Sequence, residues 1–389
     1  MTTPATVPST LLDRTRALLP QLRDGALATE QARRVLPETF DALSRAGVFR
    51  MTTPRKWGGD EVDFLTQCEV LAEVARGCPS TSWVATIFSA MSWLAGTYPE
   101  AGQEEMFAGG DPRISGVFSP TGTAVRKDGG FVVNGKWGFN TGGQGSNWTV
   151  LNAILMEGDG LPICVIAETR ELERLDDWNA TGMAGTGSHT VIAKDVFVPA
   201  RRAVPLPDLV EGKGAADRHN ATHPYFRLPL APVLIVNGGG TPLGTARGAY
   251  DTFMERLPGR PIAYTNYTNR AEAAVTHLQV GEASLILDSC ESHIRRACAL
   301  LDGPGATSLS VLDRVRSRAH VTYATGLARQ AVDILFNASG ASSIQPHVPI
   351  QRFQRDIQAL ANHAVMHTQT GTELYGRLLC GLEPNTPLY

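Results

Sequence analysis

The spacing of hydrophobic residues changes twice along this chain, and the change restricts the possible folds more than any other feature. From Leu11 to about Gly110, apolar residues recur every three or four positions, as they do on the buried side of α-helices. From Ile114 to about Pro205 they alternate with polar residues between turn-like segments, as in half-buried β-strands. Long helical patterns then continue to residue 365. Strands enclosed between two helical regions predict an α+β fold.

These changes of period divide the 389 residues into three predicted domains. An N-terminal helical domain covers residues 1–113, within which 1–8 are expected to form a disordered tail. A middle β-domain, a barrel or sandwich of modest size, covers residues 114–215. A C-terminal four-helix bundle covers residues 216–389. A chain of this length can bury the large core that such an arrangement needs.

The composition limits the partners and the compartment. A formal net charge of −3 provides no basic surface for nucleic acid. No apolar run approaches the length of a membrane-spanning helix, and the first residues contain no apolar signal core, so we expect no membrane partner. The six cysteines form no CxxC pair and no metal-ligand spacing, which is typical of buried thiols in a reducing cytoplasm. We therefore expect a cytoplasmic protein whose ligand is a small molecule.

The segment FVVNGKWGFNTGGQGSNWTV, residues 131–150, carries the most distinctive candidate site. Its two β-type runs flank a glycine-rich connector, and Asn134-Gly135 predicts a tight hairpin turn because both residues tolerate positive φ. In the connector, Phe139 and Thr141 offer aromatic surface and a hydroxyl group to a flat ligand with a polar edge. Taken alone, the segment fits a half-buried sheet with aromatic residues better than it fits a binding site.

The sequence has two further glycine-rich segments. WNATGMAGTGS, residues 178–188, is weak evidence when taken alone, because turns need glycine whether or not a ligand binds. In VLIVNGGGTPLGTARGA, residues 233–249, an apolar run followed by glycines resembles a dinucleotide-binding turn. Its fingerprint is imperfect, however, and no repeated βαβ units follow it. The second segment therefore predicts a helix of small residues that packs closely against its neighbours.

Near the C-terminus, QRFQRDIQALANHAV (residues 351–365) contains Arg355-Asp356 followed by His363. His363 and His367 stand four residues apart on one expected helical face, where two imidazoles could bind zinc. No HExxH glutamate and no clear third ligand accompany them, so no metal site is predicted. Neither a GxSxG elbow nor a P-loop lysine occurs, which leaves serine hydrolysis and phosphoryl transfer without support.

Taken together, these motifs resemble those of the acyl-CoA dehydrogenase superfamily, and more closely its branch of two-component (group D) monooxygenases, which use reduced flavin. The pattern NG-x-W-x-F-x-T-G from Asn134, the pattern W-x-x-x-G-M-x-x-T-x-S from Trp178, and Arg355-Asp356 with His363 carry the resemblance. It implies reduced FMN or FAD as the cofactor and O2 as the co-substrate. A separate NAD(P)H:flavin reductase is implied as a partner because the chain has no evident NAD(P)H-binding domain. The resemblance also implies a homotetramer in which the Ala338–Ser343 loop approaches a neighbour's flavin.

The resemblance implies a role for each matching residue as well. The Thr141 hydroxyl would reach flavin N5 and C4a, and His363 would hydrogen-bond the C4a-hydroperoxide or take a proton from the substrate. Thr186 and Ser188 would contact the ribityl and phosphate region, and Arg260 would reach the flavin phosphates. The implied cofactor-binding residues are Phe118, Ser119, Phe139, Thr141, Trp178, Thr186, Ser188 and Arg260, and the implied substrate-binding residues are Met91, Trp93 and His363.

The substrate is expected to be a small organic molecule, and its size depends on one departure from the family pattern. Many relatives that oxidise phenols or thiophenes have a histidine where this chain has Met91, and a thioether can only pack against apolar surface. A polycyclic aromatic or secondary-metabolite substrate is therefore expected beside the apolar helix that carries Met91 and Trp93. Trp83, on the same helix, is expected to be a core residue.

Three alternatives remain open from the sequence. One is an amine N-hydroxylase of the same fold. Another is an acyl-CoA dehydrogenase, although alignment on Arg355-Asp356 places Ala364 where many of those enzymes have a catalytic glutamate. The third is a non-catalytic bundle protein, which would not bind flavin.

Overall fold

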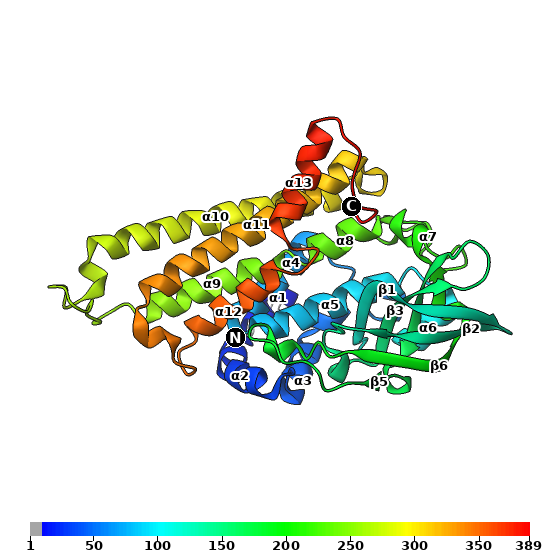
Figure 1. Cartoon of the computed structure of the whole chain (residues 1–389), viewed down its shortest axis with the longest axis horizontal. Helices are drawn as coiled ribbons and strands as arrows, with labels where there is room; N and C mark the ends of the chain where they lie inside the picture. Colours follow the sequence, from blue (N-terminus) through cyan, green and yellow to red (C-terminus); the bar gives the residue numbers. More distant parts are fainter. Residues whose placement is uncertain (1–9) are drawn as a thin grey trace, which may run out of the picture.

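The computed structural model describes residues 10–389, so the predicted tail at 1–8 lies outside the described residues. Helices come first along the chain, a β-sheet follows, and a second set of helices ends it. Figure 1 shows the sheet at one end of the molecule and the long C-terminal helices extending away from it. The predicted α+β class is confirmed. None of the helices in residues 10–389 combines the length and the hydrophobicity of a membrane span.

The N-terminal part is helical. Its helices are α1 (Leu11–Arg16), α2 (Leu19–Ala32), α3 (Pro37–Ala46), α4 (Phe64–Gly77), α5 (Pro79–Ala95) and α6 (Glu100–Phe107). Thr10 and Asp13 cap α1 through reciprocal hydrogen bonds. Gly47 ends α3 with φ 93°, a left-handed conformation that glycine adopts readily. Helix α5 is buried almost all round because it contacts α4, the first strand of the sheet and the C-terminal helix α9 (Gly240–Glu255).

Within the described residues, the middle part forms one sheet of seven strands in the order β5-β6-β2-β1-β3-β4-β7. The strands are β1 (Ile114–Lys127), β2 (Gly130–Trp137), β3 (Trp148–Leu155), β4 (Pro162–Glu168), β5 (Glu173–Arg174), β6 (Val191–Pro199) and β7 (Ala203–Pro205). Strands β1 and β3 are parallel, and the other neighbours are antiparallel. The hydrogen-bond ladder leaves β5 and β7 as edges.

The predicted hairpin turn at Asn134-Gly135 is wrong. Both residues lie inside β2, which pairs with β1 on one side and β6 on the other. A Cβ on Gly135 would lie 2.5 Å from the Cα of Gly122 on β1, and the Trp137 ring fills the space beside both glycines. The glycine is therefore needed because β1 and β2 approach each other closely here, and not because the backbone turns. The turn that joins β1 to β2 lies at residues 128–129.

The C-terminal part contains four long helices side by side and shorter ones around them. A short helix α7 (Leu206–Val210) follows the sheet, and α8 (Leu230–Asn237), α9, α10 (Ala274–Asp302), α11 (Val311–Ala338), α12 (Ile350–Ala361) and α13 (Thr368–Leu379) come after it. Figure 1 shows α10 and α11 lying along each other, with α9 and α12 beneath them. The sequence patterns predicted α9 to α12 but gave no sign of α13.

The glycine-rich segment at 233–249 is helical, as predicted, and has no dinucleotide-binding turn. Gly240, Gly244 and Gly248 lie one turn apart on α9 and face α4. A Cβ on any of the three would lie 2.0–2.6 Å from a backbone carbonyl oxygen of α4. The two helices therefore meet almost backbone to backbone, and only glycine fits at these positions.

Replacing Gly244 by alanine tests this packing. The new Cβ would lie 2.0 Å from the Ala72 carbonyl oxygen, so α4 and α9 must separate, and we expect the free energy of unfolding to fall by roughly 1–3 kcal/mol. Gly281, inside α10, has no atom within 4 Å of such a Cβ, so Gly281→Ala is the matched control. That control should gain up to about 1 kcal/mol from helix propensity. Denaturant unfolding measures both variants, and equal changes would contradict the role of Gly244.

Candidate active site

A cavity of about 250 Å³ lies where the sheet domain meets α5 and α12. Its walls come from α5, from the segments that follow β2 and precede β6, and from the end of α12. Six of the residues singled out from the sequence line it together with Trp83: Phe139, Thr141, Trp178, Thr186, Ser188 and His363. The fold thus brings a hydroxyl group from the β-domain and an imidazole from the helical bundle to one cavity.

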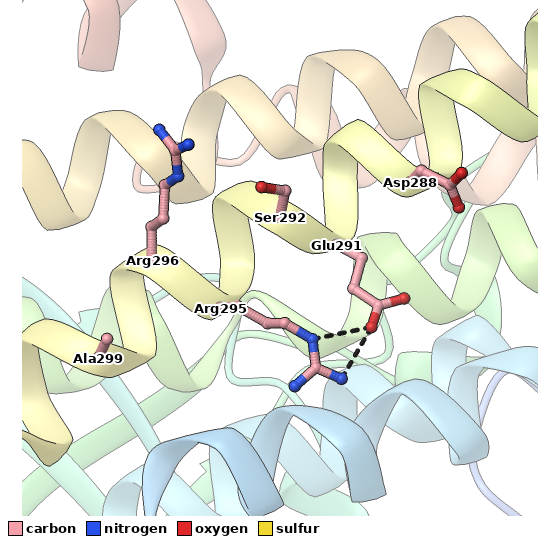
Figure 2. A pocket seen from close by; sticks show the side chains of 6 residues that line it. All are labelled: Asp288, Glu291, Ser292, Arg295, Arg296 and Ala299. Carbon is pink, nitrogen blue, oxygen red and sulfur yellow. Dashed lines mark hydrogen bonds and ion pairs between the residues drawn. The ribbon is translucent and has the colours of Figure 1, made fainter.

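Figure 2 shows a different hollow, a depression of about 490 Å³ along α10. All of its lining residues come from that one helix, and at its centre Glu291 forms an ion pair of 2.8 Å with Arg295. Its charges neutralise each other, and it has no aromatic wall. The cavity between the sheet and α12 is therefore the better candidate for a site that holds a flat organic ligand.

Three hydroxyl groups form a chain of hydrogen bonds on one wall of the cavity. Thr141 Oγ1 lies 2.9 Å from Ser188 Oγ, which lies 2.8 Å from Thr186 Oγ1. The Thr186 hydroxyl in turn donates to the backbone carbonyl of Met183 at 2.8 Å. All three side chains are almost completely buried. The chain therefore holds the Thr141 hydroxyl in place without help from bulk water.

Two aromatic rings form the adjacent wall. Phe139 lies two residues after the end of β2, has a positive φ of 62°, and is 74% exposed. Its ring meets the Trp178 indole edge to face, with centroids 6.0 Å apart. The indole N–H of Trp178 donates to the Ala184 carbonyl at 3.0 Å. These contacts fix both rings beside the hydroxyl chain.

His363 lies in the turn that follows α12, at the opposite side of the cavity from the sheet. Its ring meets the Trp83 indole edge to face, with centroids 5.0 Å apart. The residue as a whole is exposed, yet many protein atoms lie near its ring, and the desolvation they cause lowers the pKa of His363 to about 4. The Val365 N–H donates to Nδ1 at 3.4 Å, which favours the neutral tautomer with a proton on Nε2. At neutral pH, His363 is thus an uncharged hydrogen-bond donor.

The Arg355-Asp356 pair holds the glycine-rich segment against α12. The Asp356 carboxylate accepts a hydrogen bond of 2.6 Å from the Met183 N–H, and Arg355 donates to the Thr181 carbonyl at 2.6 Å. Gly182, between them, has no room for a side chain, because a Cβ would lie 2.1 Å from the Arg355 carbonyl oxygen. The sequence identified this pair only as a landmark, whereas the structure shows it joining the two halves of the cavity.

Asp356 is buried, and its pKa is raised to about 7. Burial is the largest cause, and the hydrogen bond from Met183 and the charges of Arg355 and Arg352 oppose it. The nearby carboxylate of Glu30 raises the pKa further. Glu30 also forms an ion pair with Arg355, so α2 joins the same junction.

The two tryptophans of α5 lie differently with respect to the cavity. Trp93 was expected to contact substrate, but it is buried away from the cavity and its indole N–H donates to the Tyr225 carbonyl at 2.8 Å. Trp83 is buried in the core, as expected, and it also lines the cavity beside His363. Because α5 is apolar on every side, its sequence contains no signal that separates the two faces.

Four other residues singled out from the sequence do not line the cavity: Met91, Phe118, Ser119 and Arg260. Met91 is buried against Gly116 of β1, where a Cβ would lie 2.6 Å from its sulfur atom. Phe118 and Ser119 lie on β1, and Ser119 is exposed. Arg260 lies in the loop between α9 and α10, which Figure 1 shows at the end of the bundle far from the sheet.

The expected pairing of His363 and His367 on one helical face is wrong. Helix α12 ends at Ala361, and His367 lies beyond the following turn as the N-cap of α13. Its Nδ1 accepts from the Thr370 N–H at 3.5 Å. Among residues 10–389 there is no group of three or more His, Cys, Asp or Glu side chains that could hold a metal ion.

Comparisons with known proteins agree with this architecture. Residues 12–106 match the model of the acyl-CoA dehydrogenase N-terminal domain, and residues 239–368 match that of the C-terminal domain. The oxygenase subunit HsaA of a flavin-dependent monooxygenase from Rhodococcus jostii (strain RHA1) is 31% identical over 94% of this chain and 97% of its own length. The chain belongs to the family of flavin-dependent monooxygenase oxygenase components with the acyl-CoA dehydrogenase fold.

Two further relatives support the same family. The oxygenase component of the FADH2-dependent resorcinol hydroxylase from Rhizobium sp. (strain MTP-10005) is 32% identical over 96% of this chain and 95% of its own length. The solved structure of XiaF from Streptomyces sp., in complex with FADH2 and glycerol, has a TM-score of 0.90 at 32% identity, with 97% of each chain covered. This oxygenase component is therefore an enzyme, an oxidoreductase.

The cavity of this oxygenase component fits a flavin by its chemistry. Phe139, Trp178 and Trp83 give it aromatic surface for a flat ring system, and the Thr141 hydroxyl and the His363 imidazole give it polar groups on two sides. The buried Thr186 and Ser188 hydroxyls add a polar wall. A bound reduced flavin would supply the electrons for oxygen activation, and these residues would hold its ring.

The raised pKa of Asp356 predicts a pH-dependent stability. In the unfolded chain an aspartate has a pKa near 3.9, so between about pH 4 and pH 7 the folded protein binds more protons at this position. The free energy of unfolding therefore falls, through this group, as the pH rises from about 4 to about 7. Asp356→Asn keeps an acceptor for the Met183 N–H but cannot ionise.

Denaturant unfolding of the wild type and of Asp356→Asn at several pH values measures this effect. We expect the stability of the variant relative to the wild type to increase between about pH 4 and pH 7 and then to level off. Comparing the two proteins cancels the contributions of the other titrating groups. A difference that stays constant over this range would show that Asp356 titrates normally.

Proposed function

We propose that this chain uses reduced FMN or FAD, delivered by a separate NAD(P)H:flavin reductase, and O2 to hydroxylate an aromatic substrate. The observation that carries the proposal is one cavity lined by Thr141 from the sheet side and by His363 from the bundle side. One relative is a resorcinol hydroxylase, which supports an aromatic substrate. The structure of XiaF in complex with FADH2 supports a reduced flavin as the cofactor. The free cysteines fit a reducing cytoplasm, which is where we place the enzyme.

We propose that His363 donates a hydrogen bond either to the substrate or to the oxygen atom that the substrate receives. Its neutral imidazole carries the Nε2 proton, so it can donate a hydrogen bond to a substrate oxygen without bringing a positive charge to the cavity. The Trp83 ring covers the imidazole and keeps water from one side of it. Excluding water in this way protects a reactive intermediate from decaying before it meets the substrate.

An acyl-CoA dehydrogenase reaction is less well supported. Such a reaction needs a base that removes a proton next to the thioester. No aspartate or glutamate is among the cavity-lining residues in the described part of the chain. Asp356 is near, but its carboxylate is turned to the Met183 N–H, and its raised pKa reflects burial behind the glycine-rich segment.

The size of the aromatic substrate is open to test. The expectation of a polycyclic or secondary-metabolite substrate depended on Met91, and Met91 packs against β1 away from the cavity. Trp83 and His363 offer an aromatic substrate a surface on the bundle side of the cavity, and neither side chain distinguishes one ring from several. Comparing the turnover of one-ring and multi-ring phenols by the same preparation decides between a small and a polycyclic aromatic substrate.

The oligomer is proposed to be a homotetramer in which each subunit contributes arginines to a neighbour's flavin. Arg256, Arg260 and Arg270 gather at the end of the bundle, and none forms an ion pair with an acidic side chain within residues 10–389. Burial and the neighbouring arginines lower the pKa of both Arg256 and Arg270. A Cβ on Gly340 would lie 3.4 Å from the Arg270 guanidinium, so the Ala338–Ser343 loop is beside the cluster.

Exposed apolar side chains on α10 give a second copy a surface to cover. Leu278 is 74% exposed and Leu285 is 68% exposed. We expect sedimentation to give the mass of a tetramer, and Arg260→Ala to weaken anaerobic binding of reduced flavin about tenfold without changing that mass, because a phosphate contact is lost. A monomer, or unchanged flavin affinity in the variant, would contradict the shared site.

Replacing His363 by alanine tests the proposed reaction. We expect the variant to bind reduced flavin and consume O2 but to form hydroxylated product 10²–10⁴-fold more slowly, with the oxygen released as H2O2. His367→Asn is the matched control, since asparagine can cap α13 and this histidine is outside the cavity. Product and H2O2 are measured in parallel. Normal hydroxylation by the His363→Ala variant would show that this imidazole has no part in the reaction.

A further inference from the structure

The hydroxyl chain beside the cavity has a direction, because each hydroxyl has a single proton to donate. The Met183 carbonyl can only accept, so the Thr186 proton points to it. Thr186 must then accept from Ser188, whose proton is used in that bond. Ser188 in turn must accept from Thr141. The Thr141 proton is thereby directed away from the cavity, and only its lone pairs remain for a ligand.

The anchor of this chain is rigid. Met183 has a positive φ of 54°, and the Asp356 carboxylate holds its N–H at 2.6 Å. The Thr186 N–H also donates to the Met183 carbonyl, at 3.1 Å. Thr141, Ser188 and Thr186 are 6%, 5% and 2% exposed, so water cannot easily supply substitute partners. Reversing the chain would cost the hydrogen bond from Thr186 to the carbonyl.

This direction matters because the two redox states of a flavin differ at N5. A reduced flavin carries a proton on N5 and donates a hydrogen bond there, whereas an oxidised flavin has a lone pair on N5 and accepts one. An acceptor at Thr141 attracts the first and repels the second. We propose that Thr186 and Ser188 are positioning residues that fix Thr141 as an acceptor and thereby make the site bind reduced flavin in preference to oxidised flavin. The proposal rests on the proposed function, in which Thr141 faces N5.

The same arrangement would contribute to turnover in a two-component enzyme. Such an oxygenase must take up reduced flavin from solution and release oxidised flavin after each cycle. A binding difference built into the protein favours both steps. Thr186 and Ser188 were expected from the sequence to contact the ribityl and phosphate region, so direct contact with the flavin is the competing explanation of any effect of their substitution.

The test is the affinity for free flavin in both redox states, measured by anaerobic titration of the purified full-length protein. The Thr186→Val variant lacks the hydrogen bond to the Met183 carbonyl that fixes the direction of the three hydroxyl groups. The Thr141 proton is then free to turn to the cavity, and the preference for reduced flavin should fall about three- to tenfold. Tighter binding of oxidised flavin should account for most of the change. The midpoint potential of the bound flavin should fall by about 15–30 mV, since tenfold corresponds to about 30 mV for two electrons.

Ser188→Ala is the second variant, and it should act in the same direction because it removes the acceptor of the Thr141 proton. The control is Thr245→Val, which deletes an equally buried hydroxyl that donates to the Thr241 carbonyl at 2.7 Å within α9. The control should leave the ratio of the two affinities unchanged. Circular dichroism and unfolding midpoints establish that all three variants are folded.

A double-mutant cycle separates positioning from direct contact. In a Thr141→Val background, Thr186→Val should change the ratio of affinities by less than about twofold, because the residue acts only through Thr141. The same change in both backgrounds, or an equal loss of affinity for both redox states, would overturn the proposal and indicate direct contact. Failure of the wild type to bind either form of flavin would overturn the proposed function as well.

Discussion

The hydrogen bond from the Met183 N–H to the Asp356 carboxylate joins the sheet domain to the helical bundle, and the shape of the active site depends on it. On one side of this bond, the glycine-rich segment carries Thr186 and Ser188 to the cavity wall. On the other side, α12 continues to the turn that carries His363. The two halves of the site are thus fixed relative to each other by a buried carboxylate and not by loop contacts alone.

The junction leaves little freedom for the backbone that forms it. Gly182 fits only as glycine against the Arg355 carbonyl, and Arg355 also pairs with Glu30 of α2. A junction of this kind holds the site in one geometry before any ligand binds, which reduces the ordering cost of binding. It also explains why a carboxylate with a raised pKa is retained here, since it satisfies a buried N–H that would otherwise lack a partner.

Hydrophobic periodicity predicts much of the fold, and the sequence motifs predict most of the residues that line the cavity. The remaining features depend on how the elements pack together. Thr141 and His363 could be placed in one site from the sequence because both belong to patterns of a known family. The roles of Trp83 and Trp93 could not be separated, because α5 is buried on all sides. Asn134-Gly135 has the composition of a turn, yet the approach of β1 to β2 places it inside a strand. Such choices depend on contacts between segments far apart in sequence.

The crystal structure of the protein in complex with reduced flavin, determined without oxygen, is the most direct test of the central claim. We predict that the ring system occupies the cavity between the sheet and α12, with Thr141 Oγ1 within hydrogen-bonding distance of N5 and the His363 imidazole on the side where substrate enters. A flavin bound elsewhere, or an acidic side chain facing the reactive edge of the ring, would contradict the assignment of this cavity as an oxygenase site.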